Sequence, residues 1–312
     1  IQLEQLREEN DAVLLASGRW VGRNLGLESL QFEPALKFLR EIKLGQRTSL
    51  PEKVMIIGGG AVAMDCGMSA VRLGADTTMV ILEQRDQMLI DEVEVQEALE
   101  DGVKLLNGWS TKEYVVEDGD LRKLVLQRCV RVFDDNYRPA LKFDSDDTME
   151  IEANLVVTAI GQDSNLDYLS EDIGIDERRN VLLNMAFQTS AEGVFAAGDI
   201  KAPALTISAV AEGKRAAMSI DTYLKGSGIY FGRVIDIPET RLDPKIWDYP
   251  REQAARLEPA TRRQGFAEVE STFNIDQARR EVNRCMRCDR NSAQELHLRT
   301  FPEADRPSLV GT

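Results

Sequence analysis

Three consecutive glycines form the most informative motif of the sequence. Gly58, Gly59, Gly60 and Ala63 fit the pattern G-x-G-x-x-A, directly after the apolar run Lys53–Ile57. In such a motif the first glycine permits a tight turn, the next lets backbone approach a pyrophosphate, and the alanine lets the following helix pack close to the strand. The pyrophosphate then lies at the N-terminus of that helix, where unpaired N–H groups favour negative charge. The motif predicts a dinucleotide-binding turn.

The chain after this turn continues the pattern. A helix is expected to end at Gly74, and the apolar residues 77–82 form a second strand that leads to Glu83. A carboxylate at this place accepts hydrogen bonds from both ribose hydroxyls and repels a 2′-phosphate, so we expect NAD in preference to NADP. Arg85 lies close enough to complicate that preference. The alternative interpretation is a glycine turn in an unrelated α/β protein.

A second candidate for chemistry is the pair Cys285 and Cys288. At C-x-x-C spacing, two thiolates can hold one edge of an iron–sulfur cluster or form a redox-active dithiol. A purely structural or vestigial pair is the third alternative. Cys66 is interpreted as a small packing residue. The chain has 1 histidine, which argues against a Ser-His-Asp triad and against a His-rich metal site. The chemistry is therefore expected to reside in a bound cofactor.

Length and composition indicate a globular protein of about two domains. The 312 residues include 38 Lys and Arg against 53 Asp and Glu, a net charge of -15, so nucleic acids and anionic membranes are poor partners. The apolar runs at residues 12–16 and 155–160 are far shorter than the roughly 20 residues of a membrane span. Because no export signal opens the chain, we expect a cytoplasmic protein. The first residue is Ile1, so we expect that upstream residues have been removed, left out or assigned elsewhere.

The helices and strands that must position these residues are predicted from the periodicity of apolar residues and from the positions of glycine and proline. An α/β fold is expected, with one βαβ unit over residues 53–83 and an antiparallel meander over 103–150. After about residue 230, several prolines fall in a polar tract that is expected to be extended. The remaining expected elements are strands at residues 11–16, 155–160 and 193–197, and helices at 33–43, 206–224 and 275–284.

Three further apolar strands, outside the βαβ unit of residues 53–83, end in turns that contain small residues. These turns are at Ser17 and Gly18, at Gly161 and Gln162, and at Gly198 and Asp199. In this order they resemble the flavoprotein oxidoreductases with two dinucleotide-binding domains, which include thioredoxin reductase and the small subunit of glutamate synthase. The likeness is closer to the glutamate-synthase type, through residues 54–65, 194–199 and 211–217. It covers roughly residues 10–225.

The resemblance implies a fold with two Rossmann-like domains, in which an NAD domain is inserted into an FAD domain. The partial FAD domain would span residues 1–45 and 161–230, and the NAD domain residues 46–160. Residues 231–312 would form an irregular C-terminal segment that carries the C-x-x-C pair. The family also has a second G-x-G-x-x-G near its start, and nothing before Asp11 supplies one. We therefore expect half a flavin site, completed by a missing stretch of chain or by another polypeptide.

The resemblance also implies roles for single residues. The aspartate at position 199 would bond the ribityl chain of FAD. Backbone near Thr206 and Ile207 would lie against the pyrimidine end of the flavin, where a helix N-terminus stabilises the charge of the reduced ring. The simpler alternatives are a turn or cap role for Asp199 and an N-cap role for Thr206. Members of the family that use NADP place arginines where this chain has Glu83 and Gln84.

The resulting hypothesis is an oxidoreductase module that passes a hydride from NADH to FAD and electrons on to iron–sulfur centres. The run around Cys285 and Cys288 looks like the iron–sulfur segment of glutamate-synthase-type proteins, so these two cysteines are candidate ligands of a [4Fe–4S] cluster. The partners expected are other redox subunits that carry iron–sulfur clusters and the missing half of the flavin site. Two alternatives remain: a scaffold subunit without a working flavin, and a disulfide reductase that uses the C-x-x-C pair.

Overall fold

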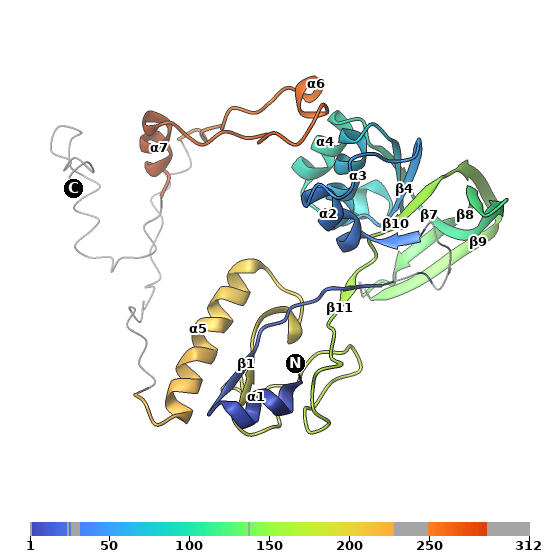
Figure 1. Cartoon of the computed structure of the whole chain (residues 1–312). Helices are drawn as coiled ribbons and strands as arrows, with labels where there is room; N and C mark the ends of the chain where they lie inside the picture. Colours follow the sequence, from blue (N-terminus) through green and yellow to red (C-terminus); the bar gives the residue numbers. More distant parts are fainter. Residues whose placement is uncertain (1, 24, 26–31, 137, 228–248, 286–312) are drawn as a thin grey trace. The chain divides into compact units, whose positions relative to one another are not determined.

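The computed structural model describes residues 2–23, 25, 32–136, 138–227 and 249–285. Contacts divide these residues into two units, the first made of residues up to 227 with 258–267 and the second of 249–257 with 268–285. Among the described residues, every helix is too short or too polar to cross a lipid bilayer. The helices, labelled in Figure 1 where there is room, are α1 (Leu3–Glu9), α2 (Ala35–Lys43), α3 (Ala61–Arg72), α4 (Glu92–Glu100), α5 (Thr206–Tyr223), α6 (Pro259–Arg262) and α7 (Ile275–Val282), with short 3-10 helices at Arg85–Gln87 and Gly198–Ile200.

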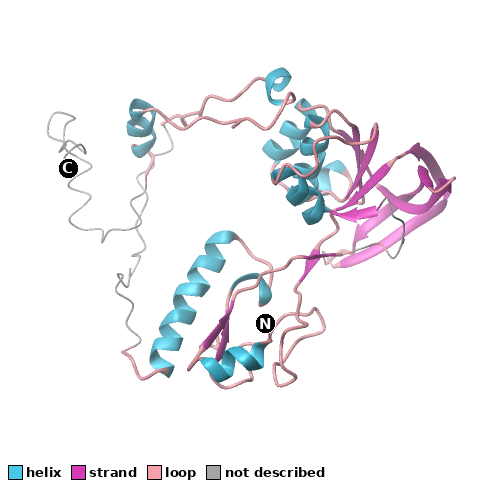
Figure 2. Ribbon diagram, viewed as in Figure 1, coloured by secondary structure: helices cyan, strands magenta, loops and turns pink. Residues whose placement is uncertain are grey.

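The strands are shown in magenta in Figure 2 and form four sheets. Two of the sheets have two strands each, with pairs β1–β12 and β2–β11. The others have five strands in the order β3-β10-β4-β5-β6 and three in the order β7-β8-β9. The strand bounds are β1 (Val13–Leu15), β2 (Val21–Gly22), β3 (Phe32–Pro34), β4 (Lys53–Ile57), β5 (Asp76–Ile81), β6 (Lys104–Asn107), β7 (Trp109–Glu117), β8 (Asp120–Phe133), β9 (Pro139–Glu152), β10 (Leu155–Thr158), β11 (Gln162–Asp163) and β12 (Val194–Ala196).

The five-stranded sheet is wholly parallel and is covered on both faces. Alternate side chains of each strand point to opposite faces. On one face Ile56 and Met79 pack with residues of helices α2, α3 and α4. On the other face Met55 and Val80 pack with the three-stranded antiparallel sheet, for example with Leu124. Burial on both faces explains why these strands read as continuous apolar runs in the sequence.

The βαβ unit β4-α3-β5 agrees with the sequence prediction, but three neighbouring elements differ from it. Helix α4 was not predicted. Strand β6 pairs parallel with β5, so the expected meander from residue 103 was wrong at its start and begins only at β7. Strand β3 pairs with β10, and Phe38 of helix α2 joins the same core, so residues 32–43 lie with this sheet although they were grouped above with the flavin domain.

A separate core surrounds the short parallel sheet β1–β12. Leu15 and Val194 point into a cluster with Leu3 of helix α1 and the loops of residues 166–191. Phe195 points the opposite way and meets Tyr223 of helix α5, with ring centroids 5.8 Å apart. Leu14 is the register partner of Phe195, so it points to the same face. It is nonetheless 40% exposed, so this face of the sheet is only partly covered by described residues.

Strand β9 forms one edge of the three-stranded sheet, with no further strand along its outer side among the described residues. Most of its side chains are exposed. Lys123 and Arg128 of the neighbouring strand β8 form ion pairs with two of its carboxylates, at 2.7 and 2.9 Å. The acidic residues of this strand are Asp144, Asp146, Asp147, Glu150 and Glu152.

The second unit is built around a short β-like ribbon. Leu257 N donates to Val269 O at 2.8 Å and Ser271 N donates to Ala255 O at 2.8 Å. Helix α7 follows and begins at a capping box in which the Asn274 side chain accepts from backbone amides of the first turn. The ribbon agrees with the extended segment expected from the prolines, and the helix falls within the predicted range.

The tip of this ribbon, residues 258–267, belongs to the first unit and is held there by Arg262. Only 4% of its side chain is exposed. It forms an ion pair with the fully buried Asp101 and another with Glu100 at 2.9 Å, and it donates to Glu97 O at 3.3 Å. Arg72, at the end of α3, approaches the second oxygen of Asp101 at 3.2 Å. Two arginines therefore satisfy one buried carboxylate, and one of them fastens the tip of the ribbon to α4.

We predict that Arg262→Ala releases this tip. Removing one partner of a buried ion pair costs about 3–5 kcal/mol when the other charge is left alone. Here Arg72 still pairs with Asp101, so we expect a smaller loss, felt mainly as the loss of the attachment of residues 258–267 to α4. Limited proteolysis with mass spectrometry should show new cleavage within residues 258–267. Arg263→Ala is the matched control, because Arg263 is exposed and its Nε donates only to the nearby Pro259 O at 3.1 Å. Equal resistance of wild type and Arg262→Ala to the protease would contradict the prediction.

Candidate functional site

The glycine turn lies between strand β4 and helix α3, at the carboxyl end of the parallel sheet. Gly58 N donates to Val80 O at 3.0 Å, which ties the turn to strand β5. Gly58 has φ +134°, and a Cβ at this position would lie 2.4 Å from Ala159 O. Only glycine combines that backbone conformation with such close approach of a second chain segment. The turn is therefore built against the end of strand β10.

The next two glycines have different surroundings. A Cβ on Gly59 would lie 2.7 Å from Cγ2 of Ile81, so this position is closed by β5. Gly60 is the N-cap of α3 and a Cβ there would meet no heavy atom within 4 Å. A glycine N-cap has no side chain to accept from the first amides of the helix. Open space next to such amides is what a phosphate group requires. Ala63 is fully buried in the core beneath, as the close packing of α3 on β4 demands.

Glu83 follows strand β5 and lies beside the same turn. Its carbonyl oxygen accepts from Asn107 Nδ2 at 3.0 Å and from Gly108 N at 3.2 Å, which fixes its backbone. Its Oε2 is 3.5 Å from the place where a Cβ on Gly59 would lie. The carboxylate is therefore directed towards the glycine turn. Arg85 is engaged elsewhere, because its Nη2 lies 2.5 Å from Oε1 of Glu92 at the start of α4.

These residues fit a dinucleotide. The structure brings together the glycine turn, the uncapped start of α3 and the carboxylate at the end of the next strand. The phosphates would meet the backbone at Gly60 and the adenosine ribose would meet Glu83. The chemistry here is binding and orientation, since no nucleophile or base is needed to hold a nicotinamide nucleotide.

The second set of predicted residues lies where the chain passes into and out of this domain. Gly18 and Gly161 both have positive φ, +68° and +109°. Gln162 pairs with Gly22 in the two-stranded connection of β2 with β11. Ser17 Oγ and Tyr168 Oη lie 2.7 Å apart. These residues form the crossover between the two parts of the chain, and their predicted role in a flavin site stays a prediction.

The third set surrounds Gly198, at the end of β12. Gly198 has φ +77° and its N–H donates to Glu212 Oε2 at 2.9 Å. Lys201 Nζ contacts the other oxygen of Glu212 at 2.5 Å. Burial opposes ionisation, but these hydrogen bonds hold the pKa of Glu212 below its ordinary value. Glu212 thus fastens the turn at residues 198–201 to helix α5. Glu212 lies within residues 211–217, which carry the family resemblance, but the sequence alone assigned no role to its side chain.

The start of α5 follows directly. Asp199 Oδ1 accepts from Ala204 N at 3.4 Å, so this carboxylate closes the loop before the helix. Leu205 is the N-cap and Thr206 is the first helical residue, so the alternative that Thr206 is an N-cap residue was wrong. Ile207 is 70% exposed. The first turn of α5 therefore presents its amides next to Asp199, without a side-chain cap.

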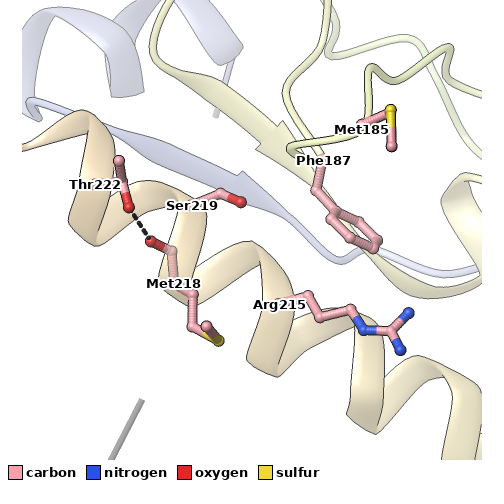
Figure 3. Close-up of a pocket in the computed structure, with 6 residues that line it drawn as sticks. All are labelled: Met185, Phe187, Arg215, Met218, Ser219 and Thr222. Atoms are coloured by element: carbon pink, nitrogen blue, oxygen red, sulfur yellow. Dashed lines mark hydrogen bonds between the residues drawn. The ribbon is translucent and has the colours of Figure 1, made fainter. Parts of the chain in front are cut away.

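A hollow of about 290 Å³ lies beside the C-terminal half of α5, away from its first turn, and is shown in Figure 3. It is open and mixed in polarity. Phe187 and Met185 lie on one side of it and Arg215 of α5 on the other, and Met185 is fully exposed. The lining residues include none of the predicted nucleotide- or flavin-binding residues. The lining residues are Met185, Phe187, Arg215, Met218, Ser219 and Thr222.

The three cysteines that the structure describes differ in solvent exposure. Cys66 and Cys129 are buried, whereas Cys285 is exposed. Burial raises the pKa of both buried thiols, and Cys66 packs in the core as expected. Cys288 lies outside the described residues. Within the described part of the chain, no group of three or more His, Cys, Asp and Glu side chains is arranged to hold a metal ion.

We predict that native alkylation separates these cysteines. Thiolates, rather than thiols, react with iodoacetamide, and burial suppresses both access and ionisation. Peptide mapping of the cluster-free chain after labelling at neutral pH should find Cys285 modified and Cys66 and Cys129 protected, with all three modified in denaturant. Rapid native labelling of Cys66 would contradict the packing described here.

Comparison with known proteins places this geometry in a family. The profile of the pyridine nucleotide-disulphide oxidoreductases matches residues 3–213. The chain is 34% identical to the NADP(+)-dependent formate dehydrogenase subunit beta of Moorella thermoacetica, over 93% of this chain and 44% of that protein. It is 33% identical to the NAD-dependent dihydropyrimidine dehydrogenase subunit PreT of Escherichia coli K12, over 73% of this chain and 51% of that protein. It is 31% identical to the glutamate synthase [NADPH] small chain of Mycobacterium tuberculosis H37Rv, over 73% of this chain and 52% of that protein. The chain spans about half the length of these curated relatives.

Solved structures show the same fold at lower identity. Thioredoxin reductase of T. acidophilum superposes with a TM-score of 0.53 at 18% identity, over 69% of this chain and 65% of the other. Mycobacterium tuberculosis FprA in complex with NADPH gives 0.56 at 18% identity, over 72% and 65%. These structures confirm the predicted α/β fold of the two-dinucleotide-domain flavoproteins. The match to the glutamate synthase small chain confirms the predicted resemblance to the glutamate-synthase type. The chain belongs to the pyridine nucleotide-disulphide oxidoreductase family.

Proposed function

We propose that this chain is the nicotinamide-nucleotide-binding part of a flavin-dependent oxidoreductase that passes a hydride from NADH to FAD. Electrons then leave singly for iron–sulfur centres of a partner subunit. The nicotinamide and the flavin supply the redox chemistry when both are bound, and the protein positions the rings and excludes water. The relatives support this role through their names, which include NADP(+)-dependent, NADPH- and NAD-dependent oxidoreductase subunits.

One observation carries the nucleotide assignment: the turn at Gly58 to Gly60. Gly58 is forced against Ala159 O, and this contact shapes the loop. The space beside Gly60 stays open at the uncapped N-terminus of α3. A glycine turn that served only to reverse the chain would have no need of that open space beside free helix amides.

The preference for NADH over NADPH rests on Glu83. Its carboxylate points towards the glycine turn, where an adenosine ribose would lie. A 2′-phosphate there would meet a like charge. Arg85 is not positioned to attract a 2′-phosphate, because its guanidinium forms an ion pair with Glu92 at 2.5 Å. The relatives' names are divided between the two nucleotides, so this residue is what supports the assignment for this chain.

For the flavin, we propose that Asp199, Gly198 and the first turn of α5 form one side of the site. The crossover residues Ser17, Gly18, Gly161 and Gln162 would support it. The rest of the site would come from polypeptide beyond the described residues. Parallel sheets need cover on both faces and more than two strands, and the sheet β1–β12 has neither among the described residues. Exposed apolar residues of β1 and of the start of α5 include Leu14, Leu205, Ile207 and Val210.

We further propose that Cys285 and Cys288 supply ligands to a [4Fe–4S] cluster, with other ligands from outside this chain. The exposure of Cys285 at the end of α7 is compatible with sharing a cluster. Cys288→Ser is expected to lower the iron content of the assembled complex, while the circular dichroism of this chain stays unchanged. Full iron content in that variant would exclude the ligand role.

We place the protein in the cytoplasm. Cys66 and Cys129 lie buried as thiols, which is the state that a reducing compartment maintains. Fractionation of cells that produce the tagged protein tests this location, and recovery from an oxidising compartment would contradict it.

The decisive experiment measures cofactors in the native complex. Its visible spectrum, flavin content and iron content should show FAD and clusters, and anaerobic NADH should bleach the flavin band. A complex that contains nicotinamide nucleotide but no flavin would reject the electron-transfer role. That result would favour the alternative of a scaffold subunit, which the incomplete sheet β1–β12 also suits. Thiol counting before and after NADH addition separates both from a disulfide reductase.

A further inference from the structure

Arg19 is a buried arginine that follows the strand-end turn at Ser17 and Gly18. Its side chain is only 5% exposed. A buried guanidinium is costly unless its N–H groups find acceptors, so the neighbours of this side chain are informative.

The guanidinium connects three separate stretches of the chain. Its Nε donates to Asp199 O at 2.9 Å, and its Nη1 donates to Gln162 O at 3.2 Å. Its Nη2 donates to Oδ1 of Asn180. Nη1 is also 3.7 Å from a carboxylate oxygen of Asp163. One side chain therefore joins the three small-residue strand ends, at residues 17–18, 161–162 and 198–199.

The acceptor on Asn180 is itself held in place. Its Nδ2 donates to Oδ2 of Asp176 at 2.8 Å, and its backbone N donates to Oδ1 of the same residue at 2.8 Å. These bonds hold the pKa of Asp176 below its ordinary value. With the amide nitrogen committed to Asp176, the amide oxygen faces Arg19. The network is thus built to receive a planar fork of donors, which lysine cannot supply.

We propose that Arg19 is a positioning residue for the flavin. It holds the backbone of Asp199 against the crossover at Gln162, and so fixes where the Asp199 carboxylate stands at the start of α5. This role rests on the proposed function, because it assigns Asp199 to the flavin. Arg19 itself need not touch the cofactor.

The test compares Arg19→Met, Arg19→Lys and Asn180→Ala with wild type in the assembled complex. FAD affinity is measured by reconstitution of the flavin-free complex, NADH affinity by quenching of protein fluorescence, and ring orientation by visible circular dichroism of the flavin. We expect Arg19→Met to weaken FAD binding at least tenfold and to alter the visible dichroism. NADH affinity should stay within twofold, because Gly60 and Glu83 are untouched. Arg19→Lys should recover affinity only in part.

Arg23→Met is the matched control. Arg23 also contacts Asp163, at 2.8 Å, but its side chain is 49% exposed and it does not reach Asp199. Its loss should leave FAD affinity within twofold. If Arg19→Met fails to assemble, Asn180→Ala removes one acceptor only and should still weaken FAD binding severalfold.

The outcomes separate the two proposals. Normal FAD affinity and dichroism in Arg19→Met, or in Asn180→Ala where the former does not assemble, would overturn the positioning role while the proposed function stands. Equal loss of FAD and NADH affinity would indicate general damage and would also overturn it. A wild-type complex that binds no flavin would overturn the proposed function and the role of Arg19 with it.

Discussion

Alanine at position 60 is expected to raise the Kd for NADH about tenfold or more without harming the fold. A Cβ there meets no heavy atom within 4 Å, so the protein accommodates the methyl group. The methyl group would instead occupy the space proposed for the pyrophosphate, and a hydrogen bond to a charged group contributes about 1.5–3 kcal/mol. Fluorescence titration with NADH and thermal unfolding measure the two effects separately.

Two further alanine variants complete the comparison. At position 58, φ is +134° and the added Cβ would lie 2.4 Å from Ala159 O, so the protein itself is expected to lose stability. The backbone conformation alone costs roughly 1–3 kcal/mol for a residue with a Cβ. Gly213→Ala, on helix α5, adds a methyl group in open space away from the turn. It should leave NADH affinity unchanged and should not lower stability, because alanine is favoured over glycine in a helix interior by about 0.5–1 kcal/mol. Unchanged NADH affinity in Gly60→Ala would contradict the dinucleotide assignment.

Glu83→Arg is expected to shift the ratio of kcat/KM for NADPH over NADH by about a hundredfold. The change removes a repulsion from the 2′-phosphate and adds an attraction, and two effects of about 1.4 kcal/mol each multiply to that ratio. The backbone of Glu83 is held by Asn107 and Gly108, so the new side chain starts from the same place.

The control for this prediction is Glu94→Arg, which makes the same charge change on the exposed face of α4. It should leave the ratio within twofold, because it is not directed towards the glycine turn. The ratio is measured with an artificial electron acceptor in the assembled complex. A ratio in Glu83→Arg equal to that of wild type would remove Glu83 from the nucleotide site.

The glycine turn between β4 and α3 could be predicted from sequence because its determinants are local. Gly58 and Gly60 lie between one strand and one helix, and the positive φ of Gly58 dictates its residue type. The nucleotide-binding role of Gly60 and Glu83 stays a prediction. The alternation of buried strands with helices likewise predicted β4, α3 and β5. Helix α4 was missed because its apolar residues are few, with Val95 and Ala98 the buried ones, and its remaining face is acidic.

The contacts that hold the domains' connections could not be predicted in this way. Arg19 meets Asp199 at a separation of 180 residues, and Arg262 meets Asp101 at 161. A single charged residue looks the same in the sequence whether it is buried or solvated, so only the folded chain reveals these partners. Glu212 could be predicted only in part. Residues 211–217 carry the family resemblance, but the hydrogen bond from Gly198 N to the Glu212 side chain depends on how α5 lies against β12.

Strand β9 has a consequence for how the protein behaves at high concentration. An open strand edge is a template on which a second chain can add, and such addition begins many fibres. The carboxylates along this edge oppose it, because two copies aligned there would face each other with like charges. Replacing Asp144 and Asp146 with threonine would keep the strand and the ion pairs of Lys123 and Arg128 and would lower this repulsion. We therefore expect such a variant to self-associate at a lower concentration than the natural sequence.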